Sequence, residues 1–324
     1  MQFRIAVQPD VKRVKPNLST MFERWTAELE RRGHVVDVVD VFAPGAIDRI
    51  RACDGFLWWF TPTPFPRDLA KRLAGALDHV TSLRLFPDWR SAWHFDDKIA
   101  QHYLFEAAAI PSPRTHVFFR EEDALQFFER AEWPMVIKLP AGYRSKGVGL
   151  LRNASEARYW TRRLFGRGVR SFERKWFATG ELQRGCVLVQ EFVAGNDFDT
   201  RVVVIGDRAF GMRRYNRPGD FRASGAGRFD LDPAGVDLDA VKLAFHVART
   251  LQMPSMSIDV LRRDGMNVVS EVNYFYEQWT LLRCPGYWTP QLEWHDGTVD
   301  AATAILDDFL AELSAVRQPA ARIP

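Results

Sequence analysis

The first 90 residues alternate short apolar runs with helical segments, and this alternation limits the possible folds more than any other feature of the sequence. Strands are expected at residues 3–7, 35–42, 55–60 and 83–86, and helices after Thr20, between the second and third strands, and over 66–80. The first helix has signals at both ends, because Thr20 and Glu23 can form a capping box and Gly33 can end it. Alternating strands and helices predict an α/β lobe in which helices cover a parallel sheet.

The pattern changes after a helix at 96–109, where Pro111 and Pro113 interrupt the chain. Beyond them we expect strands at 115–119, 134–139, 148–152, 186–192, 199–205, 208–214, 256–262 and 267–273, and helices near 121–130, 154–164, 237–250 and 299–314. Gly206-Asp207 indicates a tight hairpin. The Arg- and Gly-rich segment 165–182 carries no pattern that we can assign.

Composition excludes several classes of function. The net charge of +3 is small and no run of five like charges occurs, so nucleic acid is not an expected partner. The three cysteines are odd in number and far apart, which favours a reducing, cytoplasmic setting over a disulfide framework. No stretch approaches the ~18 apolar residues of a membrane span. None of the seven histidines forms an HxxxH or HExxH pattern, so zinc chemistry is not expected.

A lysine at the end of an apolar strand, Lys138, precedes a loop, residues 140–149, that contains Gly, Ser, Lys and Arg. Backbone amides and ammonium groups in such a loop can bind phosphate oxygens. The loop is not a Walker A motif, because it lacks GxxxxGK[ST]. An ordinary glycine-containing hairpin with exposed basic residues is the alternative interpretation.

A second candidate lies at residues 187–197, where an apolar strand becomes polar and then turns. Its backbone could pair with the edge of an adenine ring, and a nearby carboxylate could bind ribose hydroxyls. In isolation, such a segment is more often simply a strand that ends in a turn.

The most specific candidate is a pair of strand-like runs that contain Asp259, Glu271 and Asn273. Glu271 and Asn273 are two residues apart, so they share one face of a strand. Asp259 joins them if it pairs with Glu271, for which we expect a three-residue loop at 264–266. Three oxygen ligands on an otherwise apolar hairpin are costly to bury unless a cation such as Mg²⁺ binds them. The alternative is a solvated hairpin face.

These motifs occur in an order that resembles the ATP-grasp superfamily, especially its ribosomal-protein glutamate ligases and D-alanine–D-alanine ligases. The pattern is Asp97-Lys98, Lys138 with its glycine loop, Gln190-Glu191, Asp199-x-Arg201, Arg213-Arg214, Asp220-Phe-Arg222, Asp259 and Glu271-x-Asn273. The resemblance covers about residues 95–280. It implies an α/β pre-ATP-grasp domain at 1–95, a linker helix and small lobe at 96–190, and a C-terminal lobe at 191–324, the last two being α+β with antiparallel sheets.

The resemblance also implies roles for individual residues. ATP would be bound by Lys98, Lys138, Ser145, Lys146, Gly147, Gln190, Glu191, Val193 and Asp197. Asp259, Glu271 and Asn273 would hold Mg²⁺, or Mn²⁺ in its place. Arg201, Arg213 and Arg222 would stabilise the transferred phosphoryl group, since such chemistry depends mainly on positioning and positive charge.

The implied activity is a carboxylate–amine ligase that forms an acyl phosphate on a small-molecule or glycan-linked substrate. Two alternatives stay open: an ATP-grasp kinase acting on a hydroxyl, and a nucleotide-binding protein without catalysis. The segment after Asn273 departs from the family pattern, so the family's substrates do not transfer. There Tyr274, Glu277 and Arg283 are candidates for an acceptor pocket, although an aromatic core patch is the more ordinary interpretation for Phe275 and Trp279. The expected binding partners are small-molecule carboxylate and amine substrates. The oligomeric state stays open, with a homodimer as one possibility.

Overall fold

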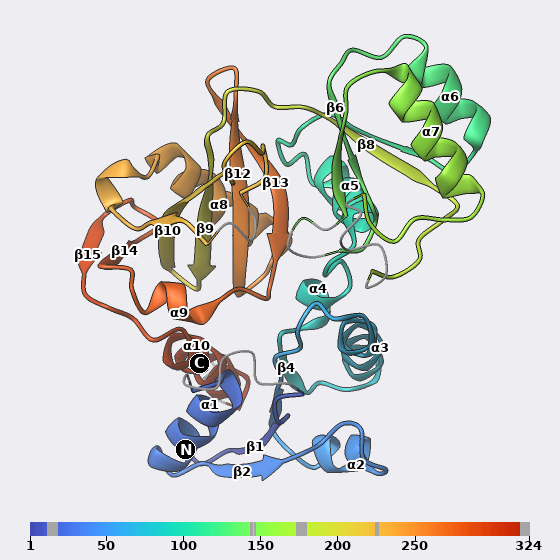
Figure 1. The fold of residues 1–324 in the computed structure, drawn as a ribbon. Coiled ribbons are helices and arrows are strands. Elements are labelled where there is room, and N and C mark those ends of the chain that lie inside the picture. The colour runs from blue at the N-terminus through green and yellow to red at the C-terminus, as the bar shows by residue number, and fades with distance from the viewer. Residues whose placement is uncertain (12–18, 143–144, 146, 173–179, 224–226, 318–324) are drawn as a thin grey trace, which may run out of the picture.

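The computed structural model describes residues 1–11, 19–142, 145, 147–172, 180–223 and 227–317. Its strands form three sheets, built successively along the chain from residues 4–86, 115–191 and 198–296. Figure 1 shows the first sheet below the other two, which lie side by side. Within the described ranges, every helix is too short or too polar to span a bilayer.

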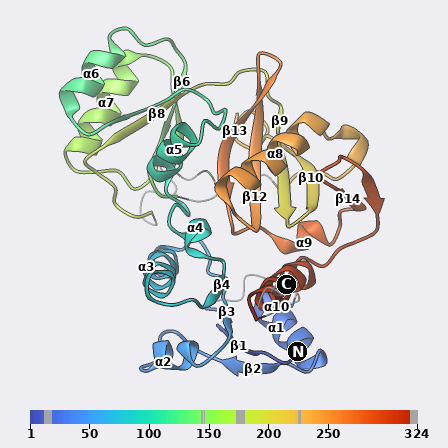
Figure 2. The same cartoon turned by 180° about the vertical axis from the view of Figure 1, so that it is seen from behind.

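The first sheet is parallel, as the alternation of strands and helices predicts. Its strands, in the order β2-β1-β3-β4, are β1 (Arg4–Val7), β2 (Val35–Val38), β3 (Gly55–Leu57) and β4 (Arg84–Phe86). Helix α1 (Met21–Arg31) lies on one side of the sheet, and α2 (Ala46–Arg51) and α3 (Pro64–Val80) lie on the other (Figures 1 and 2). The capping box of Thr20 and Glu23 is confirmed, since each side chain accepts a hydrogen bond from the other residue's amide.

The second sheet is antiparallel and has two helices on one face. Its strands, in the order β5-β8-β6-β7, are β5 (Thr115–Phe118), β6 (Met135–Lys138), β7 (Val148–Leu151) and β8 (Val187–Glu191). Helices α6 (Glu121–Phe128) and α7 (Ala154–Phe165) cover Ile137 and Val189 in a small core. Because side chains alternate along a strand, Lys138 and Gln190 point to the opposite face.

The third sheet is the largest and is also antiparallel. Its strands are β9 (Phe198–Ile205), β10 (Arg208–Tyr215), β11 (Phe229–Asp230), β12 (Ser255–Arg263), β13 (Met266–Asn273), β14 (Gly286–Trp288) and β15 (Trp294–Asp296). Helix α8 (Leu238–Leu251) packs on β9, β10, β12 and β13. The sequence pattern did not reveal the short elements β11, β14, β15 and α9 (Gln278–Leu281).

Three further helices connect the sheets. Helix α10 (Ala301–Arg317), at the C-terminal end, packs against α1, β4 and β9, so it joins the first sheet to the third (Figure 1). Helices α4 (Trp89–Ala92) and α5 (Lys98–Ala107) link the first sheet to the second. Gln101 of α5 exchanges two hydrogen bonds with the backbone of Val272, at 2.8 and 3.2 Å, and so covers the edge strand β13.

Candidate active site

The register of the β12–β13 hairpin decides whether the three predicted metal ligands share a face. Asp264 and Gly265 form a two-residue turn with positive φ angles of 50° and 81°. A regular ladder from this turn would pair Asp259 with Ser270 and turn Glu271 away. Instead, the register shifts beside Asp259, so that Ser270 is an extra, bulged residue and Asp259 pairs with Glu271.

The expected pairing of Asp259 with Glu271 is therefore confirmed, but the expected three-residue loop at 264–266 is wrong. The Ser270 hydroxyl donates to the Asp259 carbonyl at 3.1 Å, which anchors the bulge. Asn273 pairs with Ser257 and so lies on the same face as Glu271. One face of this hairpin thus carries all three predicted ligands.

Asp259 takes part in a buried chain of charges across β12, β9 and β10. Arg201 donates to its two carboxylate oxygens at 2.7 and 2.8 Å, and Arg214 donates to one of them at 2.6 Å. Arg214 also binds both oxygens of Asp199, at 2.7 and 2.6 Å. Burial alone would raise the pKa of Asp259, but Arg201 and Arg214 outweigh it and lower this pKa to about 2.

The structure corrects the arginine set. Arg213 pairs with Thr200 across the sheet and lies on the face opposite to Arg201, which pairs with Met212. Its guanidinium forms a salt bridge with Asp230 and lies over the ring of Phe198. Arg214, which sequence reasoning passed over, occupies the face that Arg213 was expected to occupy. Alternation from the Gly206-Asp207 turn could have shown this.

Lys138 lies within electrostatic reach of this hairpin face. Burial lowers the pKa of Lys138 to about 8, and the neighbouring charge of Lys98 lowers it too, whereas Glu271 and Asp259 oppose the shift. The side-chain ammonium of Lys138 makes no hydrogen bond or ion pair with another described residue. A partly buried ammonium without a partner is suited to an incoming phosphate.

The donor set fits a divalent cation in part. The side chains of Glu271 and Asn273 have no hydrogen-bond partner among the described residues, so their oxygens can bind a cation. The oxygens of Asp259 already accept three hydrogen bonds from arginines, which leaves less room for a metal ion there. In the described part of the chain, no group of three or more His, Cys, Asp or Glu side chains is arranged so that it could hold a metal ion. A cation here would therefore depend on phosphate oxygens for its remaining ligands.

The glycine loop after Lys138 is anchored at both ends. Leu139 donates to Gly147 at 2.7 Å, and Ser145, with a φ angle of 58°, accepts from Val148 at 3.2 Å. Lys146 lies outside the described residues. Arg222 binds both oxygens of Asp220 and donates to the carbonyl of Val148 at 3.0 Å. Arg222 therefore links the loop before β11 to the glycine loop.

In the segment predicted to bind adenine, Gln190 and Glu191 point in different directions. Gln190 faces the space between the second and third sheets, and its amide donates to the Thr115 hydroxyl at 2.9 Å. The Glu191 carboxylate binds Arg114 and Arg263, at 2.7 and 2.6 Å, so it ties β8 to the end of β12 rather than facing a ligand.

After the strand, the turn that contains Val193 is held by Asn196, which donates to the Val193 carbonyl at 3.2 Å. Asn196 also exchanges hydrogen bonds with the backbone of Arg262 at 3.0 and 2.9 Å. Asp197 is exposed, and its carboxylate has no partner among the described residues. The turn thus fixes the position of a carboxylate that can still bind a ligand.

A narrow cleft lies where Lys138, Gln190 and the bulged Ser270 meet. It is also lined by α5, through Lys98, Gln101, His102 and Phe105, and by Ser112, Thr115 and Leu188. Its volume is about 20 Å³, which admits roughly one water molecule. This cavity by itself is too small for a nucleotide.

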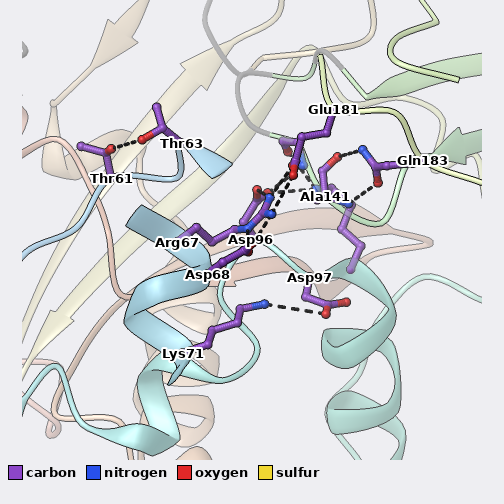
Figure 3. A network of polar contacts seen from close by, with 12 residues as sticks. Thr61, Thr63, Arg67, Asp68, Lys71, Asp96, Asp97, Ala141, Glu181 and Gln183 are labelled. Atoms are coloured by element: carbon purple, nitrogen blue, oxygen red, sulfur yellow. Dashed lines mark hydrogen bonds and ion pairs between the residues drawn. The ribbon is translucent and has the colours of Figure 1, made fainter. Parts of the chain in front are cut away.

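Sequence reasoning also missed the polar network beside the glycine loop, shown in Figure 3. Gln183 accepts from the amide of Ala141 and donates to its carbonyl, both at 2.7 Å. Asp96 accepts from the amide of Gly142 at 3.0 Å, and Lys98 donates to the carbonyl of Gly142 at 2.9 Å. No local pattern marks these residues, because their partners lie more than 40 positions away.

The segment after Asn273 belongs largely to the core. Tyr274 is fully buried, packs edge-on against Trp58 and Trp59, and donates to the carbonyl of Phe60 at 3.0 Å. The expectation that Tyr274 belongs to an acceptor pocket is therefore wrong, because this side chain is part of the aromatic core. Glu277 is exposed and accepts from the indole of Trp279 at 2.7 Å.

Comparison with known proteins agrees with this geometry. A model of the RimK-like ATP-grasp domain matches residues 95–277, which is more than half of the chain. The chain belongs to this family. The resemblance seen in the sequence is thereby confirmed, as is the α/β lobe followed by antiparallel lobes.

Among curated proteins, the chain is similar to the alpha-aminoadipate–LysW ligase LysX of Saccharolobus solfataricus, with 25% identity over 198 residues. The alignment covers 60% of this chain and 64% of that relative's length.

Two solved structures share the fold. A RimK domain protein from Sphaerobacter thermophilus has a TM-score of 0.59 at 20% identity, covering 95% of this chain and 99% of its own. A D-alanine–D-alanine ligase from Bacillus anthracis, in complex with ATP, has a TM-score of 0.58 at 15% identity, covering 97% and 98%.

Proposed function

We propose that this protein is an ATP- and Mg²⁺-dependent ligase that joins a carboxylate to an amine. Its family membership supports ATP-dependent carboxylate–amine ligation in general. The LysX relative is named as a ligase that acts on alpha-aminoadipate and LysW, and the Bacillus anthracis structure is named as a D-alanine–D-alanine ligase. For this chain, we propose a small-molecule or glycan-linked carboxylate as the substrate.

The proposed reaction has two steps. A carboxylate oxygen attacks the γ-phosphorus of ATP, which gives an acyl phosphate and ADP. The amine nitrogen then attacks the acyl carbon, loses a proton and expels phosphate, which leaves an amide. Both steps develop negative charge on phosphoryl oxygens, so fixed positive charges can lower both barriers.

The residues of this chain supply that charge from both sides of the cleft. Lys138 and Lys98 would bind the phosphates from the second sheet and α5. Arg201, on the sheet across the cleft, would face the transferred phosphoryl group, and Arg214 would hold Asp259 in place. Glu271 and Asn273 would be the main ligands of Mg²⁺, which would neutralise charge on the phosphates. Arg222 would position the glycine loop.

The observation that carries the proposal is the juxtaposition of Lys138 with the Asp259–Glu271 pair. These residues come from two different sheets, and the Ser270 bulge is needed to bring Glu271 to the face that Lys138 meets. A solvated hairpin face would need neither the bulge nor the unpaired lysine opposite it. We also propose a cytoplasmic setting, in which the three cysteines stay free as they are here.

The test is a screen of carboxylate and amine pairs for phosphate release from ATP, with mass spectrometry of the product. We expect phosphate and ADP only when both substrates are present, and a product with the mass of the amide. ADP formed with an alcohol alone, without free phosphate, would instead indicate the kinase. With the active pair, Glu271→Gln should abolish turnover while the circular dichroism spectrum stays unchanged. Undiminished turnover would remove Glu271 from the site.

A further inference from the structure

Arg67 is a buried cation of the first lobe with three carboxylate partners. It lies in the first turn of α3 and is only 6% exposed. Its guanidinium donates to Asp96 at 3.2 Å, to Glu181 at 2.8 and 3.1 Å, and to Asp68 at 2.9 Å. Burying so many charges is rarely a source of net stability, so a positioning role has to be considered.

Two of these carboxylates lead to the same point of the glycine loop. Asp96 accepts from the amide of Gly142 at 3.0 Å. Glu181 is followed two residues later by Gln183, whose side chain binds both backbone groups of Ala141. Figure 3 shows Arg67, Glu181, Gln183 and Ala141 converging from separate parts of the chain. Both arms from Arg67 thus end at the dipeptide Ala141-Gly142.

The same dipeptide holds a predicted phosphate ligand. Lys98 donates to the carbonyl of Gly142 at 2.9 Å, and its ammonium lies 3.6 Å from Asp96. Because Asp96 is 4% exposed and Arg67 is beside it, neither can move without disturbing the backbone that orients Lys98. These contacts connect the first lobe to the start of the glycine loop.

We propose that Arg67 is a positioning residue through which the first lobe controls nucleotide binding at the glycine loop, by way of Asp96 and of Glu181 with Gln183. The proposal rests on the proposed function, because it assumes that this loop binds the phosphates of ATP. It adds that a change in the first lobe, such as the arrival of a substrate at the end of its parallel sheet, alters the affinity for nucleotide.

The test measures the affinity for ADP with Mg²⁺ by isothermal titration calorimetry, at a temperature where every variant is folded. Arg67→Met should weaken binding roughly 5- to 150-fold, the usual range of coupling between sites. Arg24→Met is the matched control, because Arg24 of α1 forms a salt bridge with Asp300 that also joins distant parts of the chain but does not lead to the loop. The control should bind ADP as the wild type does. Arg67→Lys should restore part of the affinity, because it keeps the charge beside Asp96 but loses the fork to Glu181.

A double-mutant cycle separates positioning from a general loss of stability. Arg67→Met and Gln183→Leu act on the same dipeptide, so their effects on ADP affinity should fall short of additive. Equal affinities of Arg67→Met and Arg24→Met for ADP, or fully additive effects in the cycle, would overturn the positioning role of Arg67. The proposed function would be unaffected. If the wild type itself fails to bind ADP with Mg²⁺, the proposed function fails as well.

Discussion

Arg213 and Arg214 are adjacent in the sequence, yet they have different surroundings. Arg214 is buried and bridges Asp199 and Asp259, whereas Arg213 pairs with Asp230 at a partly exposed position on the other face. Because of this difference in burial, the two sets of salt bridges should contribute unequally to the free energy of unfolding. Removal of a buried cation leaves uncompensated buried carboxylates, while a surface pair contributes little.

Replacing each arginine by methionine measures this difference. Arg214→Met should lower the free energy of unfolding by about 3–5 kcal/mol, because Asp199 and Asp259 would stay buried without it. Arg213→Met should cost less than about 1 kcal/mol. Urea unfolding at neutral pH gives both values. If the two variants prove equally stable, Arg214 does not hold together the buried group of charges that it forms with Asp199 and Asp259.

The β12–β13 hairpin is the element on which the candidate site depends. Its two-residue turn alone would place Glu271 on the wrong face, and the single bulged residue Ser270 corrects this. Val268 and Val269, on either face of β13, are both fully buried. The hairpin therefore has to satisfy the core and the site with one register.

Deletion of single residues tests the register. Without Ser270, a regular ladder from the same turn still pairs Glu271 with Asp259 and keeps both valines on their faces. Without Val268, Glu271 still pairs with Asp259, but Val269 moves to the position of Val268. Ser270 then takes the buried position of Val269 on the opposite face. The Val268 deletion should therefore be less stable than the Ser270 deletion by about 1.5–3 kcal/mol, the value of one buried valine. Chemical denaturation of both proteins measures this, and equal stabilities would contradict the bulged register.

At the scale of the whole molecule, the candidate site lies where the three sheets meet. Lys138 comes from the second sheet and Glu271 from the third. Arg67, on α3 beside the first sheet, binds Asp96, which in turn accepts from Gly142 of the glycine loop (Figures 1 and 3). The cleft where Lys138, Gln190 and Ser270 meet has a volume of about 20 Å³, which is too small for a nucleotide. Nucleotide binding should therefore couple to the relative position of these sheets, and a bound nucleotide should stabilise their assembly.

ADP with Mg²⁺ at about 100 times its dissociation constant should raise the free energy of unfolding by about 2.7 kcal/mol. This increase should shrink as the pH rises through about 8, because the free folded protein then loses the proton of Lys138 that phosphate binding requires. The direction of this pH dependence follows from the pKa of Lys138, which lies below the usual lysine value in the free folded protein. A bound anion raises this pKa again, so binding is favoured when Lys138 is protonated. Thermal denaturation at pH 7 and pH 9 measures the effect, with Lys138→Met as the control. An increase that stays constant from pH 7 to 9 would argue against Lys138 as a phosphate ligand.

The sequence by itself determined the local elements and the family. Periodicity, the capping box of Thr20 and the order of the motifs were sufficient, because each depends on residues close together in the chain or on a pattern shared with relatives. Only the tertiary structure decided which side chains meet. The Ser270 bulge, the bonds of Glu191 to two arginines and the path from Arg67 to Gly142 all depend on how separate segments pair. Such pairing is fixed by the packing of the sheets and leaves no local signal to read.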